Sequence, residues 1–312
     1  MRYIHKELQP VLAQLPELMI NAAQMPAIRQ FLKDHLIGES QSHPQVECLE
    51  RWIPSQHHGR EIRVLTYRSK AHKKQTPALL WIHGGGYVMG IPEMDTALCE
   101  RFVLEAGCQV IAVDYRLAPE HPYPAPLEDC FDSLCWLSKN ATTLEVDVNK
   151  IAVAGASAGG GLTAALSLLT RDRQGPKIAF QMPLYPMIDD RHQTYSSTEI
   201  QDSRVWNEQS NRNAWAMYLG NILAQQVPSY AAPARADDYA HIPPTYTCVG
   251  DQDPFRDETL DYVAALAKAG VPTEFHLYPG CFHGFDGYAP MTGIGQQAIQ
   301  QYVQALATFF HE

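Results

Sequence analysis

A serine near the middle of the chain has the spacing that a nucleophile requires. Gly155, Ser157 and Gly159 form a G-x-S-x-G pattern, which directly follows the apolar run 150–155 and precedes a helical run. On such a strand–turn–helix connection the hydroxyl is held clear of the backbone, because the flanking glycines carry no Cβ atoms to collide in the turn. The pattern alone also fits an ordinary turn, so its interpretation depends on partners for the serine.

A serine hydroxyl becomes nucleophilic at neutral pH only with a general base, and the base needs a carboxylate to orient it. The chain offers both after two late apolar runs, which predict strands at 245–250 and 274–279. His283 follows the second strand and is the favoured base. His276 falls inside the strand pattern, which is typical of a packed core histidine. The order serine, acid, histidine is the one that α/β serine hydrolases use.

Four carboxylates in or near the loop GDQDPFRDE compete for the role of the acid. They are Asp251, Asp253, Asp257 and Glu258. Asp251 immediately follows the strand, and Asp257 precedes a helical run, where it suits an N-cap position. Asp253 is the best choice, but the spacing alone leaves the other three open.

An ester carbonyl attacked by the serine develops negative charge on its oxygen, and backbone amides stabilise that charge. The run HGGG at 83–86 follows a predicted strand, and its bare backbone lets amides approach an oxyanion to about 2.7–3.1 Å. Ala158, directly after the serine, offers a further amide. A phosphate site is disfavoured, since neither glycine cluster fits a phosphate-binding pattern. His83 suits a structural role that fixes this loop.

Short apolar runs alternate with helical segments along most of the chain, which indicates an α/β fold with a mostly parallel sheet. The predicted strands are 46–53, 61–67, 77–83, 109–115, 150–155, 178–185, 245–250 and 274–279. The connection 186–244 is longer than a crossover requires, and it contains a helix-like stretch rich in aromatic residues. We expect it to form a small cap, together with the helical residues 1–40.

The composition limits the possible partners. A content of 46% hydrophobic residues suits a large core, and a net charge of −10 disfavours nucleic acid and anionic membranes. The seven cysteines and thirteen histidines show no disulfide or metal-ligand spacing, so we expect no metal. No run approaches the roughly 18 apolar residues of a membrane span, and no signal peptide is recognisable. These features predict a cytoplasmic protein.

At this point the chain resembles a known family, the hormone-sensitive-lipase-like branch of the α/β-hydrolases, also called bacterial family IV carboxylesterases. Five motifs in the order of that family carry the resemblance: HGGGYVMG (83–90), DYRLAPEHPYPAPLED (114–129), GASAGG (155–160), DPFRDE (253–258) and HGF (283–285). One position departs from the family. The residue before the serine is often acidic there and is Ala156 here.

The resemblance implies six site residues: the nucleophile Ser157, the acid Asp253, the base His283 and the oxyanion amides of Gly85, Gly86 and Ala158. It also implies the α/β-hydrolase fold, with an eight-stranded, mostly parallel sheet flanked by helices. Residues 1–312 would form a single domain, with a helical cap made from about 1–40 and 186–244. Members of this family typically hydrolyse short-chain acyl esters without a cofactor.

We therefore predict a serine carboxylesterase that acts on a small-molecule ester as a monomer or homodimer and needs no cofactor. Four aromatic residues are candidates for lining an apolar substrate pocket: Tyr87, Trp206, Trp215 and Tyr218. Two alternatives stay open. One is a non-catalytic small-ligand receptor on the same fold, which the presence of His283 disfavours. The other is an amidase or acyltransferase with the same triad.

Overall fold

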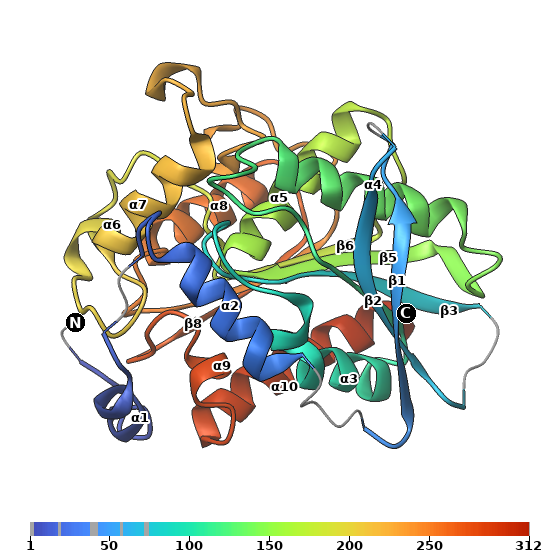
Figure 1. Ribbon diagram of the computed structural model, residues 1–312, viewed down its shortest axis with the longest axis horizontal. Helices are drawn as coiled ribbons and strands as arrows, with labels where there is room; N and C mark the ends of the chain where they lie inside the picture. Colours follow the sequence, from blue (N-terminus) through green and yellow to red (C-terminus); the bar gives the residue numbers. More distant parts are fainter. Residues whose placement is uncertain (1–2, 18–19, 38–42, 57–58, 72–74, 312) are drawn as a thin grey trace.

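A mostly parallel sheet of eight strands runs through the molecule (Figure 1). The computed structural model describes residues 3–17, 20–37, 43–56, 59–71 and 75–311. The strand order is β1-β2-β4-β3-β5-β6-β7-β8, in which β2 pairs antiparallel with β1 and β4 and all other neighbours are parallel. The predicted α/β fold with an eight-stranded, mostly parallel sheet is confirmed.

Each of the eight predicted strands is present, with ends that differ by a few residues. They are β1 Val46–Pro54, β2 Glu61–Ser69, β3 Thr76–Ile82, β4 Gln109–Val113, β5 Val146–Ala156, β6 Phe180–Leu184, β7 Thr245–Gly250 and β8 Thr273–Tyr278. Strands β4, β6 and β7 are buried along their whole length. Strand β8 is only half buried, because it forms an edge of the sheet. The expectation of a core position for His276 is therefore wrong, and its ring bonds to Glu274 instead.

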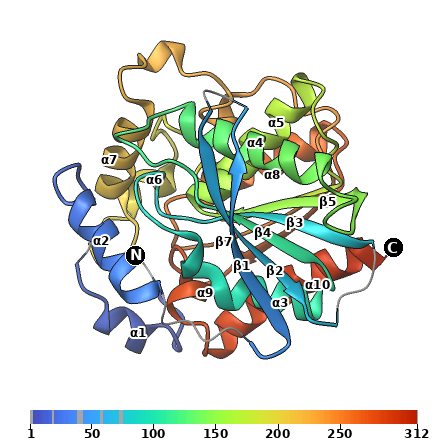
Figure 2. The same ribbon diagram turned by 45° about the vertical axis from the view of Figure 1, so that its right-hand side comes forward.

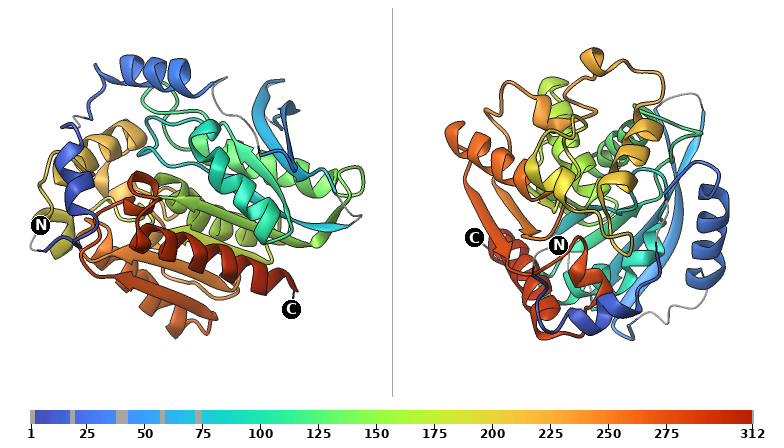
Figure 3. Two further views of the ribbon diagram at one scale, coloured as in Figure 1. Left: turned by 90° about the horizontal axis from the view of Figure 1, so that it is seen from below. Right: turned by 90° about the vertical axis from the view of Figure 1, so that its left-hand side faces the viewer.

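Helices cover both faces of the sheet. They are α1 Gln9–Gln14, α2 Met25–Leu36, α3 Thr96–Glu105, α4 Ala125–Lys139, α5 Ala158–Asp172, α6 Tyr195–Glu199, α7 Glu208–Leu219, α8 Arg256–Lys268, α9 Phe285–Tyr288 and α10 Gly293–His311, with short 3₁₀ turns at Pro92–Asp95, Ala224–Gln226 and Pro233–Arg235. Helices α4 and α5 lie on one face of the sheet and α3 and α10 on the other (Figure 3), and most of their buried apolar side chains belong to two separate core clusters. No helix in the described ranges is long and apolar enough to cross a membrane.

The two segments predicted to form a cap lie on the same side of the molecule, where α1, α2, α6 and α7 gather (Figure 2). Asn213 of α7 donates to the carbonyl of Ile20, which joins the two segments directly. Arg29 of α2 donates to the carbonyl of Val88, next to the glycine run. Part of the predicted range, residues 1–2, 18–19 and 38–40, lies outside the described residues. The cap itself stays a prediction.

The long connection between β4 and α4 is fastened by a buried carboxylate. Asp129 is 1% exposed, and its two oxygens accept bonds from the guanidinium of Arg116 at 2.9 Å. The backbone amide of Arg116 and the side chain of Arg60 donate to the same carboxylate. Asp129 therefore closes the loop on itself and ties it to the strand pair β1–β2. This is a structural use of the proline-rich motif 114–129.

Replacing Asp129 with alanine should lower the free energy of unfolding by about 2–3 kcal/mol, because the arginines lose charged hydrogen bonds but still reach water. Urea denaturation measures the change. Glu120→Ala is the matched control, since Glu120 pairs with Arg29 at the surface and such pairs contribute only about 0.2–1 kcal/mol. Equal losses in the two variants would contradict the proposed role of Asp129.

Candidate active site

Ser157 lies on a sharp turn between β5 and α5. Its backbone has φ 58° and ψ −117°, a conformation that costs a non-glycine residue about 1–3 kcal/mol. Three hydrogen bonds hold it there. Its amide donates to the carbonyl of Leu184 at 2.9 Å, and its carbonyl accepts from the amides of Gly161 at 2.9 Å and Met187 at 3.0 Å. The strained turn is thus fixed from both the sheet and the helix.

The glycines on either side of Ser157 are required by close backbone contacts. A Cβ atom on Gly159 would lie 2.0 Å from the carbonyl oxygen of Ile82, and one on Gly155 would lie 2.5 Å from the same atom. Any side chain at these positions would push α5 away from β3. The steric reason expected for the G-x-S-x-G pattern is therefore present in the structure.

His283 bonds at both ring nitrogens and joins three loops at the carboxyl ends of β5, β7 and β8. Its Nε2 lies 2.8 Å from Oγ of Ser157, and its Nδ1 lies 2.7 Å from Oδ2 of Asp253. The other oxygen of Asp253 accepts from the amide of Phe255 at 2.8 Å. Asp253 is fully buried, and Ser157 and His283 are each 7% exposed. The three side chains form one continuous hydrogen-bonded chain.

The other three candidate acids bind elsewhere. Asp251 accepts from the amide of Gly280 at 2.6 Å. Glu258 is buried, which raises its pKa, and it accepts from the amide of Ile188 at 2.9 Å. Of the four carboxylates in this loop, all of them described, Asp253 is the one hydrogen-bonded to the histidine.

Asp257 lies in the first turn of α8, so its expected role as the N-cap is wrong. Phe255 is the N-cap residue, and no side chain caps that end. Asp257 instead accepts from the amide of Ser196 at 2.8 Å and from Arg256 at 2.6 Å. Burial opposes ionisation, but these bonds outweigh it and lower the pKa of Asp257. The residue ties α8 to α6.

The glycine run faces the serine across a cavity of about 280 Å³. Gly85 has φ 113° and Gly86 has φ 61°, and a Cβ on Gly86 would lie 2.3 Å from the ring of Trp206. Within the described residues, the amides of Gly85, Gly86 and Ala158 donate to no backbone or side-chain acceptor. All three amides are therefore available to a bound oxygen.

His83 holds the glycine run in place, as expected. Its Nδ1 lies 2.7 Å from the carbonyl of Gly84, and its ring stacks on Tyr115 with centroids 4.2 Å apart. The hydroxyl of Tyr115 donates to the carbonyl of His83 at 3.0 Å. Burial lowers the pKa of His83 and so favours the neutral ring.

Of the four aromatic residues predicted to line a pocket, Trp206 lines the cavity that contains Ser157. Tyr87, Trp215 and Tyr218 are not among its lining residues and are at most 2% exposed. Tyr87 stacks on Tyr218 with centroids 3.9 Å apart, and its hydroxyl donates to the carbonyl of Met187 at 2.6 Å. These three aromatic residues pack together and connect α7 to the segment that follows the glycine run.

Two acidic residues near the serine carry no recognisable sequence motif. Asp95 lines the cavity, and the indole of Trp81 donates to its Oδ2 at 2.7 Å. Burial raises the pKa of Asp95 to about 6. Asp286, in the short helix α9, accepts from the hydroxyls of Tyr185 and Tyr302 at 3.1 and 3.2 Å, and burial raises its pKa. No signal in the sequence could have found them.

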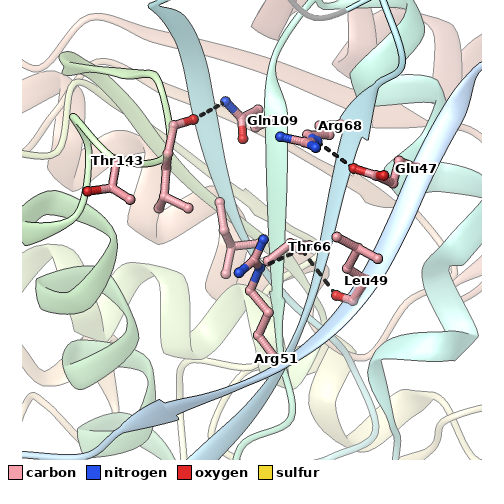
Figure 4. A pocket seen from close by; sticks show the side chains of 9 residues that line it. Glu47, Leu49, Arg51, Thr66, Arg68, Gln109 and Thr143 are labelled. Atoms are coloured by element: carbon pink, nitrogen blue, oxygen red, sulfur yellow. Dashed lines mark hydrogen bonds and ion pairs between the residues drawn. The ribbon is translucent and has the colours of Figure 1, made fainter.

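A second cavity, of about 60 Å³, lies over β1, β2 and β4 and contains none of these residues (Figure 4). Glu47 and Arg68 form an ion pair at 2.6 Å across its wall. The cavity is too small for an organic substrate. The described part of the chain contains no group of three or more histidine, cysteine, aspartate or glutamate residues arranged for a metal ion.

Comparisons with known proteins identify the family of the chain. The model of a family described as alpha/beta hydrolase fold matches residues 79–287, a span that contains the serine, the aspartate and the histidine. Esterase LipI of Mycobacterium tuberculosis is 33% identical over 285 residues, which cover 91% of this chain and 88% of that protein. Carboxylesterase NlhH of the same species is 32% identical over 254 residues, or 80% and 79% of the two chains.

A solved structure of a bacterial heroin esterase is similar over almost the entire chain. It superposes with a TM-score of 0.93 at 34% identity, and the match covers 99% of this chain and 98% of that one. The similarity therefore includes the N-terminal helices and the long connection 186–244 as well as the sheet.

Proposed function

Because the chain belongs to the alpha/beta hydrolase fold family, we propose that it hydrolyses carboxylic esters with Ser157 as its nucleophile. The observation that carries the proposal is the pair of hydrogen bonds made by His283, to Ser157 at 2.8 Å and to Asp253 at 2.7 Å. The five ordered motifs support a place in the hormone-sensitive-lipase-like branch. The names of the related proteins support carboxylic esters as the substrate class.

The reaction proceeds in two steps through an acyl-enzyme. Oγ of Ser157 attacks the ester carbonyl carbon while Nε2 of His283 takes the hydroxyl proton. The protonated ring then gives this proton to the departing alcohol. Water attacks the acyl-enzyme in the second step and loses its proton to the same nitrogen, which returns one to the serine oxygen. Asp253 keeps the proton on Nδ1 and stabilises the positive ring.

The negative oxygen of each tetrahedral intermediate is stabilised by the amides of Gly85, Gly86 and Ala158. Ala158 is the first residue of α5, so its amide also lies at the positive end of the helix dipole. A cavity of about 280 Å³ beside these amides suits a short acyl group. Trp206 forms one wall of the cavity and limits its size.

Replacing Ser157 with alanine should lower kcat by about four to six orders of magnitude, because the acyl-enzyme no longer forms. Hydrolysis of p-nitrophenyl esters of increasing acyl length measures this loss, and activity should be highest with short chains. Ser167→Ala is the matched control. Ser167 lies in α5, the helix that follows Ser157, and its buried hydroxyl has no hydrogen-bond partner among the described residues. The variant should keep full activity. If Ser157→Ala lost only about tenfold in kcat, the proposal would be contradicted.

Asp253→Asn should lower kcat by about 10⁴-fold, because an amide no longer keeps the proton on Nδ1 of His283. Asp257→Asn serves as the control, because it makes the same change of charge four residues away in the first turn of α8. Its kcat should fall by less than about tenfold, since Asp257 does not contact the histidine. If Asp257→Asn were the more damaging substitution in p-nitrophenyl acetate hydrolysis, the assignment of the acid would be wrong.

Gly86→Ala should lower kcat by about 10²–10³-fold, the cost of losing one oxyanion donor. Alanine is strained at φ 61°, which favours a shift of the loop, and its methyl group collides with the ring of Trp206, so one of the two must move. Gly59→Ala provides the comparison, since Gly59 has a similar φ of 64° with nothing within 4 Å of the added atom. That variant should remain active in the same assay. If the Gly86→Ala variant kept the activity of the wild type, the assignment of the Gly86 amide as an oxyanion donor would be wrong.

A further inference from the structure

A larger cavity adjoins the one that contains Ser157. It has a volume of about 790 Å³ and lies between α3, α9 and α10. The two cavities share five wall residues, among them Ala156, which directly precedes the nucleophile. Because alanine contributes only a methyl group to this wall, a substrate in the catalytic cavity has room to extend into its larger neighbour.

Two carboxylates line the larger cavity without a cationic partner. Asp95 and Asp286 form no ion pair with any lysine, arginine or histidine in the described parts of the chain. Asp286 is 3% exposed, and its Oδ1 is buried and meets no hydrogen-bond donor in good geometry. Arg101, the cation in the wall, is already bound to Glu105 at 2.6 Å. A buried carboxylate without a counter-charge is costly, so the cavity favours a positive guest.

The remaining walls suit an organic cation better than a metal ion. Trp81, Tyr185 and Tyr302 line the same cavity, and each donates a hydrogen bond to one of the two carboxylates, which fixes the carboxylates in the wall. Most other wall residues are apolar, including Leu98 and Ile299. A metal ion would need several oxygen ligands close together, whereas a substituted ammonium group needs apolar contact for its alkyl groups and nearby negative charge.

We propose that this cavity binds the ammonium group of cationic esters, so that Asp95, Asp286 and the apolar walls beside them select positively charged substrates. The inference rests on the proposed ester hydrolysis at Ser157 and deepens it. It names the part of the substrate that the cavity binds. This part is an alkylated or protonated amine on the same molecule as the ester. The overall charge of −10 would favour the approach of such substrates.

The test uses matched pairs of acetate esters. One member of each pair carries a trimethylammonium group on an alkyl spacer of two to six carbons, and the other has a tert-butyl group in its place. At pH 8, above the pKa of about 6 for Asp95, the wild type should show a ratio of the two kcat/KM values of about ten or more for at least one spacer, which corresponds to ~1.4 kcal/mol. A general effect on catalysis cancels in this ratio.

The double variant Asp95→Asn, Asp286→Asn should bring the ratio to about one, since the amides keep most of the size but lose the charge. Asp261→Asn removes the same charge from an exposed position on α8 and should leave the ratio unchanged. Equal kcat/KM values for every pair in the wild type would overturn the inference and leave the proposed esterase intact, provided that the neutral esters are hydrolysed.

A binding measurement on the wild type separates the cation site from the proposed ester hydrolysis. It needs no variant, so its result does not depend on how well a variant folds. Calorimetry on the wild type should show choline binding at least about tenfold more tightly than its carbon analogue 3,3-dimethylbutan-1-ol. If no ester is hydrolysed but choline is preferred, the proposed function fails and the cation site stands. Equal or absent binding of the two alcohols would exclude the cation site whatever the enzyme activity.

Discussion

The structure depends on a close backbone contact between α5 and β3. Gly155 and Gly159 let the backbone of Ile82 approach closely, because a Cβ atom added to either glycine would lie only 2.5 Å or 2.0 Å, respectively, from the carbonyl oxygen of Ile82. This contact allows Ser157 to adopt a conformation that only a surrounding network of hydrogen bonds can sustain. The position of the serine, the direction of the helix dipole and the access to the glycine run all follow from that turn.

The second requirement is that distant parts of the chain end at the same edge of the sheet. Parallel strands place their carboxyl ends together, so the loops after β5, β7 and β8 meet although 126 residues separate Ser157 from His283. His283 connects these loops by one hydrogen bond at each ring nitrogen. The glycine run after β3 completes the same edge, and His83 and Tyr115 fix its course by stacking and hydrogen bonds. A rigid sheet thus positions groups that short loops carry.

The fold, Ser157 and His283 were accessible from the sequence, because glycine spacing and strand order express backbone constraints directly. The choice of Asp253 among four nearby carboxylates rested on the family resemblance, since spacing alone left the other three open. Packing among aromatic side chains was not, since nothing local in the sequence distinguishes Trp206 at the cavity from Trp215 in the core beneath it. The same limit applied to the half-exposed His276 and to Asp257, whose partner Ser196 comes from a distant helix. The role proposed for Asp95 and Asp286 depends on tertiary packing alone. No spacing rule relates two carboxylates so far apart in the chain.

The central claim, an acyl-enzyme on Ser157, is tested most directly by mass spectrometry. The protein is mixed with a slowly hydrolysed p-nitrophenyl ester, quenched in acid within the first turnovers, digested and analysed. We expect the acyl mass on the peptide that contains Ser157, and none on that peptide in the Ser157→Ala variant. An acyl group on another residue, or steady hydrolysis without any acylated peptide, would contradict the mechanism.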